Sequence, residues 1–281
     1  MIFENNKEFA LADFPFAQKD DHKYSRGAVL IRGGGIGATG AACLAATAAL
    51  RMAGLVSVVC NREALPIYAV KLNAVMTILA DHIDDFHQIL QSKKFSSLLI
   101  GPNNGVDYAT YETILSALEY DLNLILDADA LSCLAEQKFD YSKLSGENIL
   151  TPHEGEFKRL FDGKINPQKP RDYRAQKAAE LTGAVVVLKG AETIIAAPDG
   201  KTAINRNAPA QLATAGSGDV LAGIIAGLCS SKKLSSFQAA CAGVWLHGEA
   251  ANLFGVGLTA DDLPNMLAKV LNNHTTRHFS C

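Results

Sequence analysis

A glycine-rich turn that ends in a carboxylate gives the sequence its clearest chemical signal. The segment Thr214 to Asp219 reads Thr-Ala-Gly-Ser-Gly-Asp and leads into an apolar stretch, Val220 to Leu228, with the composition of a buried helix. Glycines let backbone approach a ligand closely, and the N–H groups at a helix start favour an anion such as phosphate. A carboxylate there can accept the proton of an attacking hydroxyl. We therefore predict a phosphoryl-transfer site with Asp219 as catalytic base and an anion hole at Gly216, Ser217 and Gly218.

A simpler interpretation is that Ser217 or Asp219 only caps the helix, as these residue types commonly do. Capping alone does not account for the glycines at 223 and 227 of the apolar helix. Two other junctions are candidates for ligand contact: Ala41 in a helix after Gly33-Gly34-Gly35, and His153 after a predicted strand. The alternatives there are a flexible glycine turn and a structural histidine.

Two pairs of carboxylates also follow predicted strands. Asp127 and Asp129 come after the run 123–126, and strand alternation would point them to the same side. They are candidates for binding Mg²⁺ or for anchoring a loop. Glu154 and Glu156 lie at a helix start, where interaction with the helix dipole is favoured over metal binding.

These residues lie between short apolar runs and longer helical patterns. Each run is nearly continuous in apolar character, as strands buried on both faces are, and the alternation with helices predicts a doubly wound, mainly parallel α/β sheet. The predicted strands are 28–31, 55–60, 97–100, 123–126, 148–150 and 184–188. The predicted helices are 39–53, 108–120, 154–161, 171–182, 219–230, 235–253 and 260–271.

After Lys189 the pattern changes. Residues 193–197 and 202–205 flank a Pro-Asp-Gly turn, which predicts an antiparallel hairpin at one end of the sheet. No low-complexity linker or internal repeat divides the chain, so we expect one domain over residues 1–281. Val244, Trp245 and Leu246 are candidates for core or for an oligomer interface, with core as the default.

The composition excludes several classes of protein. The 281 residues include 26 basic and 29 acidic side chains with no dense basic run, which argues against a nucleic-acid partner. No apolar stretch is long enough to span a membrane, and the first residues lack a secretory pattern, so we expect a cytoplasmic protein. Six cysteines show no metal-ligand or redox spacing and are expected to be free, buried thiols.

The segment from Asn207 through Leu228 resembles the signature of the NAD(P)H-hydrate dehydratase family, within the ribokinase-like superfamily. Further stretches resemble the same family in the same order, so the resemblance covers the chain from about His22 to about Asn252. These stretches are 22–42, 100–105, 126–131, 151–156 (Thr-Pro-His-Glu-Gly-Glu) and 188–193 (Leu-Lys-Gly-Ala-Glu-Thr).

The resemblance implies repair of a damaged cofactor. Such enzymes phosphorylate the C6 hydroxyl of hydrated NADH or NADPH with ADP or ATP and then eliminate phosphate, which regenerates the dihydropyridine. It implies nucleotide binding by Lys189, Gly190, Ala191, Glu192, Thr193 and Gly218, and binding of the hydrated dinucleotide by Ala41, Gly105, His153 and Asp219. Mg²⁺ is expected as the companion of the nucleotide, without an assigned metal ligand in the chain. A homotetramer is also implied.

The sequence departs from the family pattern at Asn103-Asn104, where the family usually has Gly-Leu within Gly-Pro-Gly-Leu-Gly. Asn tolerates left-handed backbone, so the turn is expected to persist. Ala215 and Ser217 replace the usual Gly and Thr, and the epimerase domain often fused upstream is not found. Two alternatives stay open, a small-alcohol kinase of the same superfamily and an inactive nucleotide-binding protein. The stand-alone chain favours ADP over ATP as donor.

Overall fold

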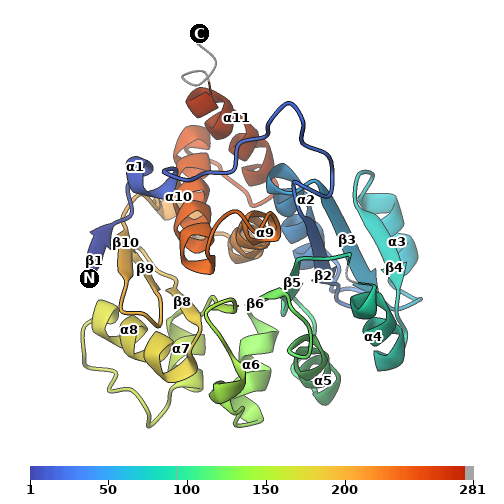
Figure 1. The fold of residues 1–281 in the computed structure, drawn as a ribbon, viewed down its shortest axis with the longest axis horizontal. Coiled ribbons are helices and arrows are strands. Elements are labelled where there is room, and N and C mark those ends of the chain that lie inside the picture. The colour runs from blue at the N-terminus through green and yellow to red at the C-terminus, as the bar shows by residue number, and fades with distance from the viewer. Residues whose placement is uncertain (93, 276–281) are drawn as a thin grey trace.

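The protein is built around a ten-stranded sheet with helices on both faces (Figure 1). The computed structural model describes residues 1–92 and 94–275. The sheet is parallel throughout from β8 to β4, which confirms the doubly wound, mainly parallel prediction. In sheet order the strands are β1 (Ile2–Glu4), β10 (Thr202–Asn205), β9 (Thr193–Ala196), β8 (Val185–Leu188), β7 (Ile149–Leu150), β6 (Asn123–Leu126), β5 (Ser97–Ile100), β2 (Ala28–Arg32), β3 (Leu55–Cys60) and β4 (Met76–Leu79).

The predicted hairpin is present at one end of the sheet. β9 pairs antiparallel with β8 and with β10, where Ile195 lies opposite Ala203. β1 then adds in parallel to β10 at the outer edge. The sequence did not predict β1 or β4, because these edge strands are short and partly exposed and lack a continuous apolar run.

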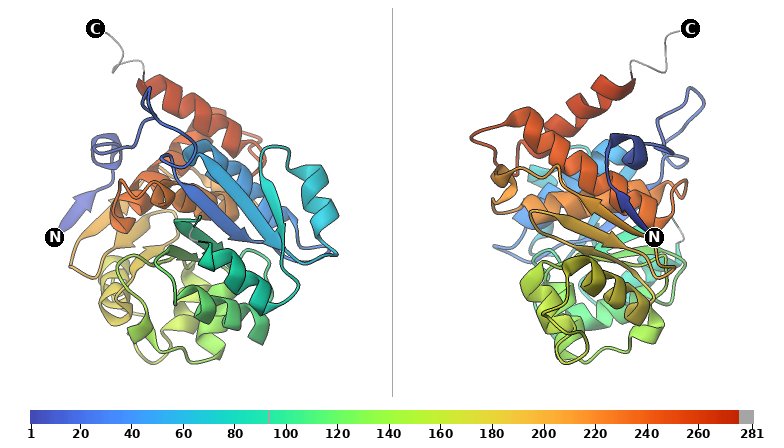
Figure 2. Two further views of the ribbon diagram at one scale, coloured as in Figure 1. Left: turned by 45° about the vertical axis from the view of Figure 1, so that its right-hand side comes forward. Right: turned by 90° about the vertical axis from the view of Figure 1, so that its left-hand side faces the viewer.

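The helices form two layers. The layer that includes the C-terminal helices covers one face, and the helices from α4 to α8 cover the other (Figure 2). They are α1 (Lys7–Ala10), α2 (Gly40–Met52), α3 (Leu65–Lys71), α4 (Ile83–Gln91), α5 (Tyr108–Ala117), α6 (Asp129–Glu136), α7 (Glu154–Leu160), α8 (Arg171–Thr182), α9 (Ser217–Ser230), α10 (Ser236–Phe254) and α11 (Leu263–Thr275), with short 3-10 helices η1 (Tyr141–Lys143) and η2 (Ala210–Leu212).

Side-chain alternation along the strands fills both interfaces. In β2, Val29 and Ile31 belong to the cluster beneath α2 and α9, whereas Leu30 belongs to the cluster on the opposite face. All three side chains are buried, which accounts for the continuous apolar run in the sequence. Trp245 and its two neighbours are also buried within the chain, so the prediction of core is confirmed there.

Helices α2 and α9 pack unusually closely, and glycine is the reason. A β-carbon at Gly223 would overlap with the backbone of Ala45, and one at Gly227 would meet Ala49 and Met52. Since residue numbers rise together along the contact, the two helices run in the same direction. Their N-termini therefore lie at the same end of the pair, and this accounts for the glycines that capping left unexplained.

None of the helices among the described residues combines the length and apolarity that crossing a bilayer requires. Five cysteines, Cys43, Cys60, Cys133, Cys229 and Cys241, are free and buried, as predicted. Cys281 lies outside the described residues.

Candidate functional site

The predicted site residues follow the carboxyl ends of adjacent parallel strands. Lys189 follows β8, His153 lies just beyond β7, Asp127 follows β6 and Gly105 lies beyond β5. These strands are neighbours in the sheet, and β2, which leads into the Gly33–Gly35 turn and Ala41, comes next. Ligands of open α/β sheets bind at this edge. The fold thus brings segments that are far apart in the sequence together along one edge of the sheet.

The N-terminus of α9 carries the proposed base. Gly216 is the N-cap residue, with a φ of 85°, and no side chain caps the helix through a hydrogen bond. Ser217 and Asp219 are therefore in the first turn without serving as caps. The helix begins two residues before the predicted start, so the N–H groups of its first turn lie within the Gly-Ser-Gly segment. This geometry favours anion binding over the capping interpretation.

A buried ion pair lies beside this helix end. Lys189 Nζ is 2.6 Å from Asp127 Oδ1 and 4.0 Å from Glu156 Oε2. Thr151 Oγ1 also donates to Asp127 Oδ1 at 2.8 Å. Burial lowers the pKa of Lys189, but the charges of Asp127 and Glu156 outweigh it and raise that pKa above its usual value. Lys189 is thus a fixed cation, and a β-carbon at Gly218 would lie 3.6 Å from its Nζ.

The environment of Asp219 suits a base. Burial, together with the charges of Asp127 and Asp129, raises the pKa of Asp219 to about 6, and Lys189 opposes the shift. At neutral pH the carboxylate is ionised but more basic than an ordinary aspartate. A base of this strength takes a proton efficiently near its working pH.

A cavity of about 580 Å³ opens between the end of β8 and the N-terminus of α9. It brings together His153, Lys189, Gly190, Ala191, Thr193, Ser217 and Gly218, all predicted from the sequence. The remaining wall is mostly apolar and comes from the segment 208–214 with Leu221, Val244 and His247. A polar end and an apolar wall suit a nucleotide, whose phosphates and base have different requirements.

His247 was not predicted as part of the site. Its Nε2 lies 3.2 Å from Ser217 Oγ, and burial lowers the pKa of His247 to about 4, so the ring is neutral at physiological pH. The sequence signal was a lone histidine on the buried face of the apolar helix α10. Such a residue is usually structural, and only the fold brings it to Ser217.

His153 both caps a helix and lines the cavity. Its Nδ1 accepts hydrogen bonds from the N–H groups of Gly155 and Glu156, and Glu156 Oε2 accepts from the N–H of His153 in return. This capping box fixes the start of α7. The side chain of His153 is nevertheless 55% exposed, and it lines the cavity. Glu156 therefore acts at the helix start, as expected.

The loop after β5 is anchored by side chains that bind its backbone. The N–H of Gly105 donates to Asp129 Oδ2 at 2.9 Å. Asp129 is thus a loop anchor, one of its two predicted alternatives. Asp127 and Asp129 bind different partners, because β6 ends at Leu126 and Asp129 already begins α6.

The Asn103-Asn104 segment keeps the turn that the family pattern expects. Asn103 adopts a φ of 53°, so the prediction of left-handed backbone is confirmed. Asn104 Oδ1 accepts from the N–H of Gly101, and its Nδ2 donates to the carbonyl of Arg32 at 2.9 Å. Asn104 therefore ties the loop after β5 to the end of β2.

Some predicted residues lie outside the cavity lining. Ala41 is buried in the first turn of α2, Gly216 packs beside Leu44, and Gly105 lies in the loop after β5. Glu192 is exposed and forms an ion pair with Arg206 at 2.8 Å. The side chain of Glu192 thus binds Arg206 and is separate from the ion pair of Lys189 and Asp127.

No three His, Cys, Asp or Glu side chains in the described part of the chain converge closely enough to hold a metal ion. Mg²⁺ commonly keeps several waters and binds substrate phosphates with few protein ligands, so the site is compatible with Mg²⁺ carried by a nucleotide.

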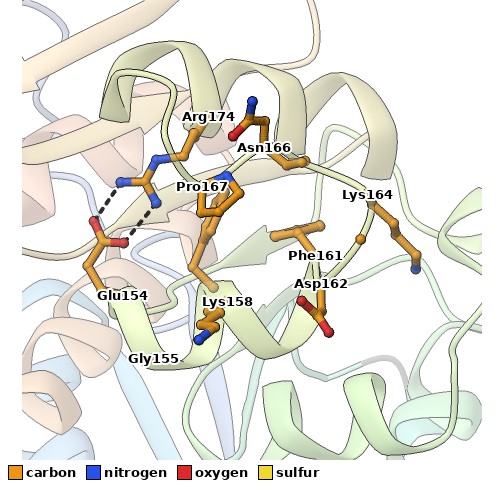
Figure 3. Close-up of a pocket in the computed structure, with 12 residues that line it drawn as sticks. Glu154, Gly155, Lys158, Phe161, Asp162, Lys164, Asn166, Pro167 and Arg174 are labelled. Atoms are coloured by element: carbon orange, nitrogen blue, oxygen red, sulfur yellow. Dashed lines mark hydrogen bonds and ion pairs between the residues drawn. The ribbon is translucent and has the colours of Figure 1, made fainter.

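A separate cavity of about 650 Å³ lies between α7, the segment 161–167 and Arg174 of α8 (Figure 3). The guanidinium of Arg174 forms two hydrogen bonds with the carboxylate of Glu154 at its wall, at 2.9 and 3.1 Å. None of the predicted site residues lines this cavity.

Comparisons with known proteins identify the family of the chain. The sequence profile of the NAD(P)H-hydrate dehydratase family matches residues 29–273. An ADP-dependent (S)-NAD(P)H-hydrate dehydratase of Neisseria meningitidis is 35% identical over 275 residues, covering 94% of this chain and 91% of the relative. A bifunctional NAD(P)H-hydrate repair enzyme of Moorella thermoacetica is 39% identical over 282 residues; the match covers 93% of this chain but 52% of the relative, so the chain spans about half its length.

Among solved structures, the ADP/ATP-dependent NAD(P)H-hydrate dehydratase of Bacillus subtilis, co-crystallised with ATP and Mg²⁺, superposes with a TM-score of 0.82. The identity is 28%, and the match covers 96% of this chain and 98% of that chain. The ribokinase-like architecture is thereby confirmed. The chain belongs to the NAD(P)H-hydrate dehydratase family.

Proposed function

We propose that this protein repairs the S epimer of hydrated NADH and NADPH, with ADP or ATP as phosphoryl donor and Mg²⁺ accompanying the nucleotide. Family membership supports the substrate, and the names of the Neisseria and Bacillus relatives support the donors. The observation that carries the proposal is the position of Asp219. Its carboxylate lies in the first turn of α9, close enough to Lys189, Asp127 and Asp129 for their charges to act on its pKa.

The proposed reaction gives each of these groups a role. Asp219 takes the proton of the C6 hydroxyl as its oxygen attacks the terminal phosphorus of the nucleotide. Backbone N–H groups of Gly216, Ser217 and Gly218, with the Lys189 cation, stabilise the negative charge on the transferred group. The C6–O bond then breaks with phosphate as leaving group. Loss of a proton from C5 completes the C5=C6 double bond of NADH or NADPH.

On this proposal, Lys189, Gly190, Ala191, Thr193 and Gly218 bind the nucleotide, with Glu192 as an outer member of the same loop. Ala41, Gly105 and His153 contact the hydrated dinucleotide. The base of the nucleotide occupies the apolar wall formed by residues 208–214 and Leu221. Mg²⁺ bound to phosphate would supply charge neutralisation, and no protein ligand is assigned to it.

The decisive experiment supplies hydrated NADH with ADP or ATP and follows absorbance near ~340 nm together with released phosphate. We expect both to rise in proportion, faster with ADP. A stable phosphate ester without recovery of absorbance would identify a small-alcohol kinase instead. Binding of nucleotide without any product would identify an inactive nucleotide-binding protein.

We also propose that residues 1–281 form one domain, that the protein acts in the cytoplasm and that it assembles as a homotetramer. The continuous sheet supports the first point, and the family resemblance supports the last. Light scattering coupled to size-exclusion chromatography measures the assembly; a monomer mass would reject the tetramer.

A further inference from the structure

Arg171 connects three elements next to the nucleotide cavity. It is the first residue of α8, and its guanidinium reaches back to the end of β8. Nη2 donates to the carbonyls of Leu188 at 3.2 Å and Lys189 at 3.0 Å. Nε lies 2.9 Å from Glu154 Oε1, at the start of α7. One side chain thus ties the strand end that carries Lys189 to the helix that begins after His153.

The backbone of Gly190 packs directly against this guanidinium. A β-carbon at Gly190 would overlap with Arg171 Nη1, so only glycine allows the approach. Gly190 also begins the turn that lines the cavity, where Thr193 Oγ1 donates to the carbonyl of Gly190 at 3.1 Å. The position of the Gly190–Thr193 turn therefore depends on where Arg171 lies.

Arg174, one turn later on α8, provides a natural comparison. Arg174 and Arg171 both pair with Glu154. Figure 3 shows the two hydrogen bonds between Arg174 and Glu154. Its Nε donates to the carbonyl of Lys169 at 3.1 Å, and its guanidinium lies over the ring of Phe157. Within the described residues, no hydrogen bond of Arg174 reaches β8. The two arginines thus have the same charge and the same carboxylate partner but different backbone targets.

We propose that Arg171 is a positioning residue for the nucleotide. This inference rests on the proposed function, because it assigns the Lys189–Thr193 turn to nucleotide binding. Arg171 acts through the backbone it holds, setting the position of the Lys189–Thr193 turn, and with it the Lys189 side chain, for the phosphates. The planar fork of arginine donates to two carbonyls while pairing with a carboxylate, and lysine cannot reproduce that geometry.

The test compares Arg171→Ala, Arg171→Lys and Arg174→Ala by calorimetric titration with ADP and ATP and by steady-state kinetics. We expect Arg171→Ala to weaken nucleotide binding about 10- to 100-fold, from the loss of charge-assisted hydrogen bonds. Arg171→Lys should be impaired nearly as much, although it keeps the charge. Arg174→Ala should bind nucleotide within about threefold of the wild type, because the hydrogen bonds of Arg174 go to Glu154 and Lys169 and not to the end of β8. The KM for the hydrated dinucleotide should change little in all three variants.

Two further measurements separate positioning from general damage. Gly190→Ala should reproduce the nucleotide defect with Arg171 intact, because its methyl group displaces the guanidinium. Guanidinium at low, non-denaturing concentration should restore part of the activity of Arg171→Ala. Equal nucleotide affinities in Arg171→Ala and Arg174→Ala, with nucleotide bound by the wild type, would overturn this inference alone. A wild type that binds neither ADP nor ATP would overturn the proposed function and the inference with it.

Discussion

The proposed nucleotide side and the proposed substrate side of the site are held by different kinds of contact. On the nucleotide side, Lys189 is fixed by buried carboxylates and Arg171 holds the strand end that carries it. On the substrate side, the glycine loop after β2 has open space around Gly35, Gly37 and Gly40, where a β-carbon would meet no atom other than Asn61 Nδ2 within 4 Å. Charged side chains form the first side directly, whereas on the second side the side chains of Asp129 and Asn104 serve to anchor the loop backbone.

This difference indicates that the two sides have different tasks in the proposed reaction. Fixed charges must be in place before the phosphoryl group moves, because reorganising them during reaction would raise the barrier. A backbone loop rich in glycine can approach a bulky dinucleotide without side-chain conflict. Substitutions on the nucleotide side should therefore change turnover and stability strongly, and those on the substrate side should change mainly the affinity for the dinucleotide.

The largest effect is expected where the two sides meet, at Asp219. Asp219→Asn should lower turnover by about 10²- to 10⁴-fold, the usual contribution of a general base, while nucleotide binding persists. In the wild type, turnover should fall as pH drops through about 6, because protonation removes the base. Stopped assays from pH 5 to 9 measure this profile. Unchanged turnover in Asp219→Asn would remove Asp219 as the base.

The same substitution should stabilise the protein at neutral pH. The pKa of Asp219 is raised from 3.8 to about 6 in the folded state, so the folded protein holds this proton more tightly than the unfolded chain. The stabilising effect of that proton is complete below about pH 4 and is lost as pH rises through about 6. Thermal denaturation should therefore show a higher Tm for Asp219→Asn than for wild type at pH 8, with no such difference near pH 4.

The next largest effect is expected at the ion pair. Asp127→Asn leaves Lys189 without its nearest buried partner and should lower the free energy of unfolding by roughly 2 to 4 kcal/mol. Because the charge of Asp127 raises the pKa of Asp219, the midpoint of the pH–rate profile should also move below 6. Denaturant titration measures the first effect. Asp199→Asn, which breaks the exposed pair with Lys201, is the control and should cost less than about 1 kcal/mol.

A smaller effect is expected at Ser217, on the nucleotide side. Ser217→Ala removes the hydroxyl next to His247 Nε2 and leaves a buried ring nitrogen without this partner, which should cost about 1 to 3 kcal/mol. Ser231→Ala, just beyond the other end of α9, is a matched control with a partly buried hydroxyl. A cost for Ser217→Ala no greater than for Ser231→Ala would mean that the contact with His247 contributes no stability.

The sequence predicted those features that have a local signal. Strands buried on both faces, such as residues 55–60, are continuous apolar runs, and the turn before α9 has glycines at fixed positions. The unpredicted helices α1, α3, α4 and α6 are short, with four to nine residues each, and α3 also contains Pro66 and a strongly exposed Val70. A helix of this length has too few turns for its apolar periodicity to distinguish it from a loop.

The pairing of the fixed side chains had no such signal. Asp127 was a candidate from its place after a strand and Lys189 from the family resemblance, but they are 62 residues apart, and they meet only because the sheet brings β6 and β8 to either side of β7. Arg171 and His247 likewise acquire their roles only through packing. By contrast, the glycine turns of the proposed substrate side could be located from the sequence, although their contacts could not.

The smallest effect is expected at the segment that departs from the family pattern. Asn104→Leu, which restores the usual residue, removes the tether to Gly101 and Arg32 and should cost about 1 kcal/mol. It should raise the KM for the hydrated dinucleotide a few-fold and leave the KM for nucleotide unchanged. Asn103→Gly should be near neutral, since glycine adopts the observed φ of 53° readily. If Asn104→Leu instead weakened nucleotide binding, the two sides would be coupled through β5 and β6, and the division between fixed side chains and backbone loops would not hold.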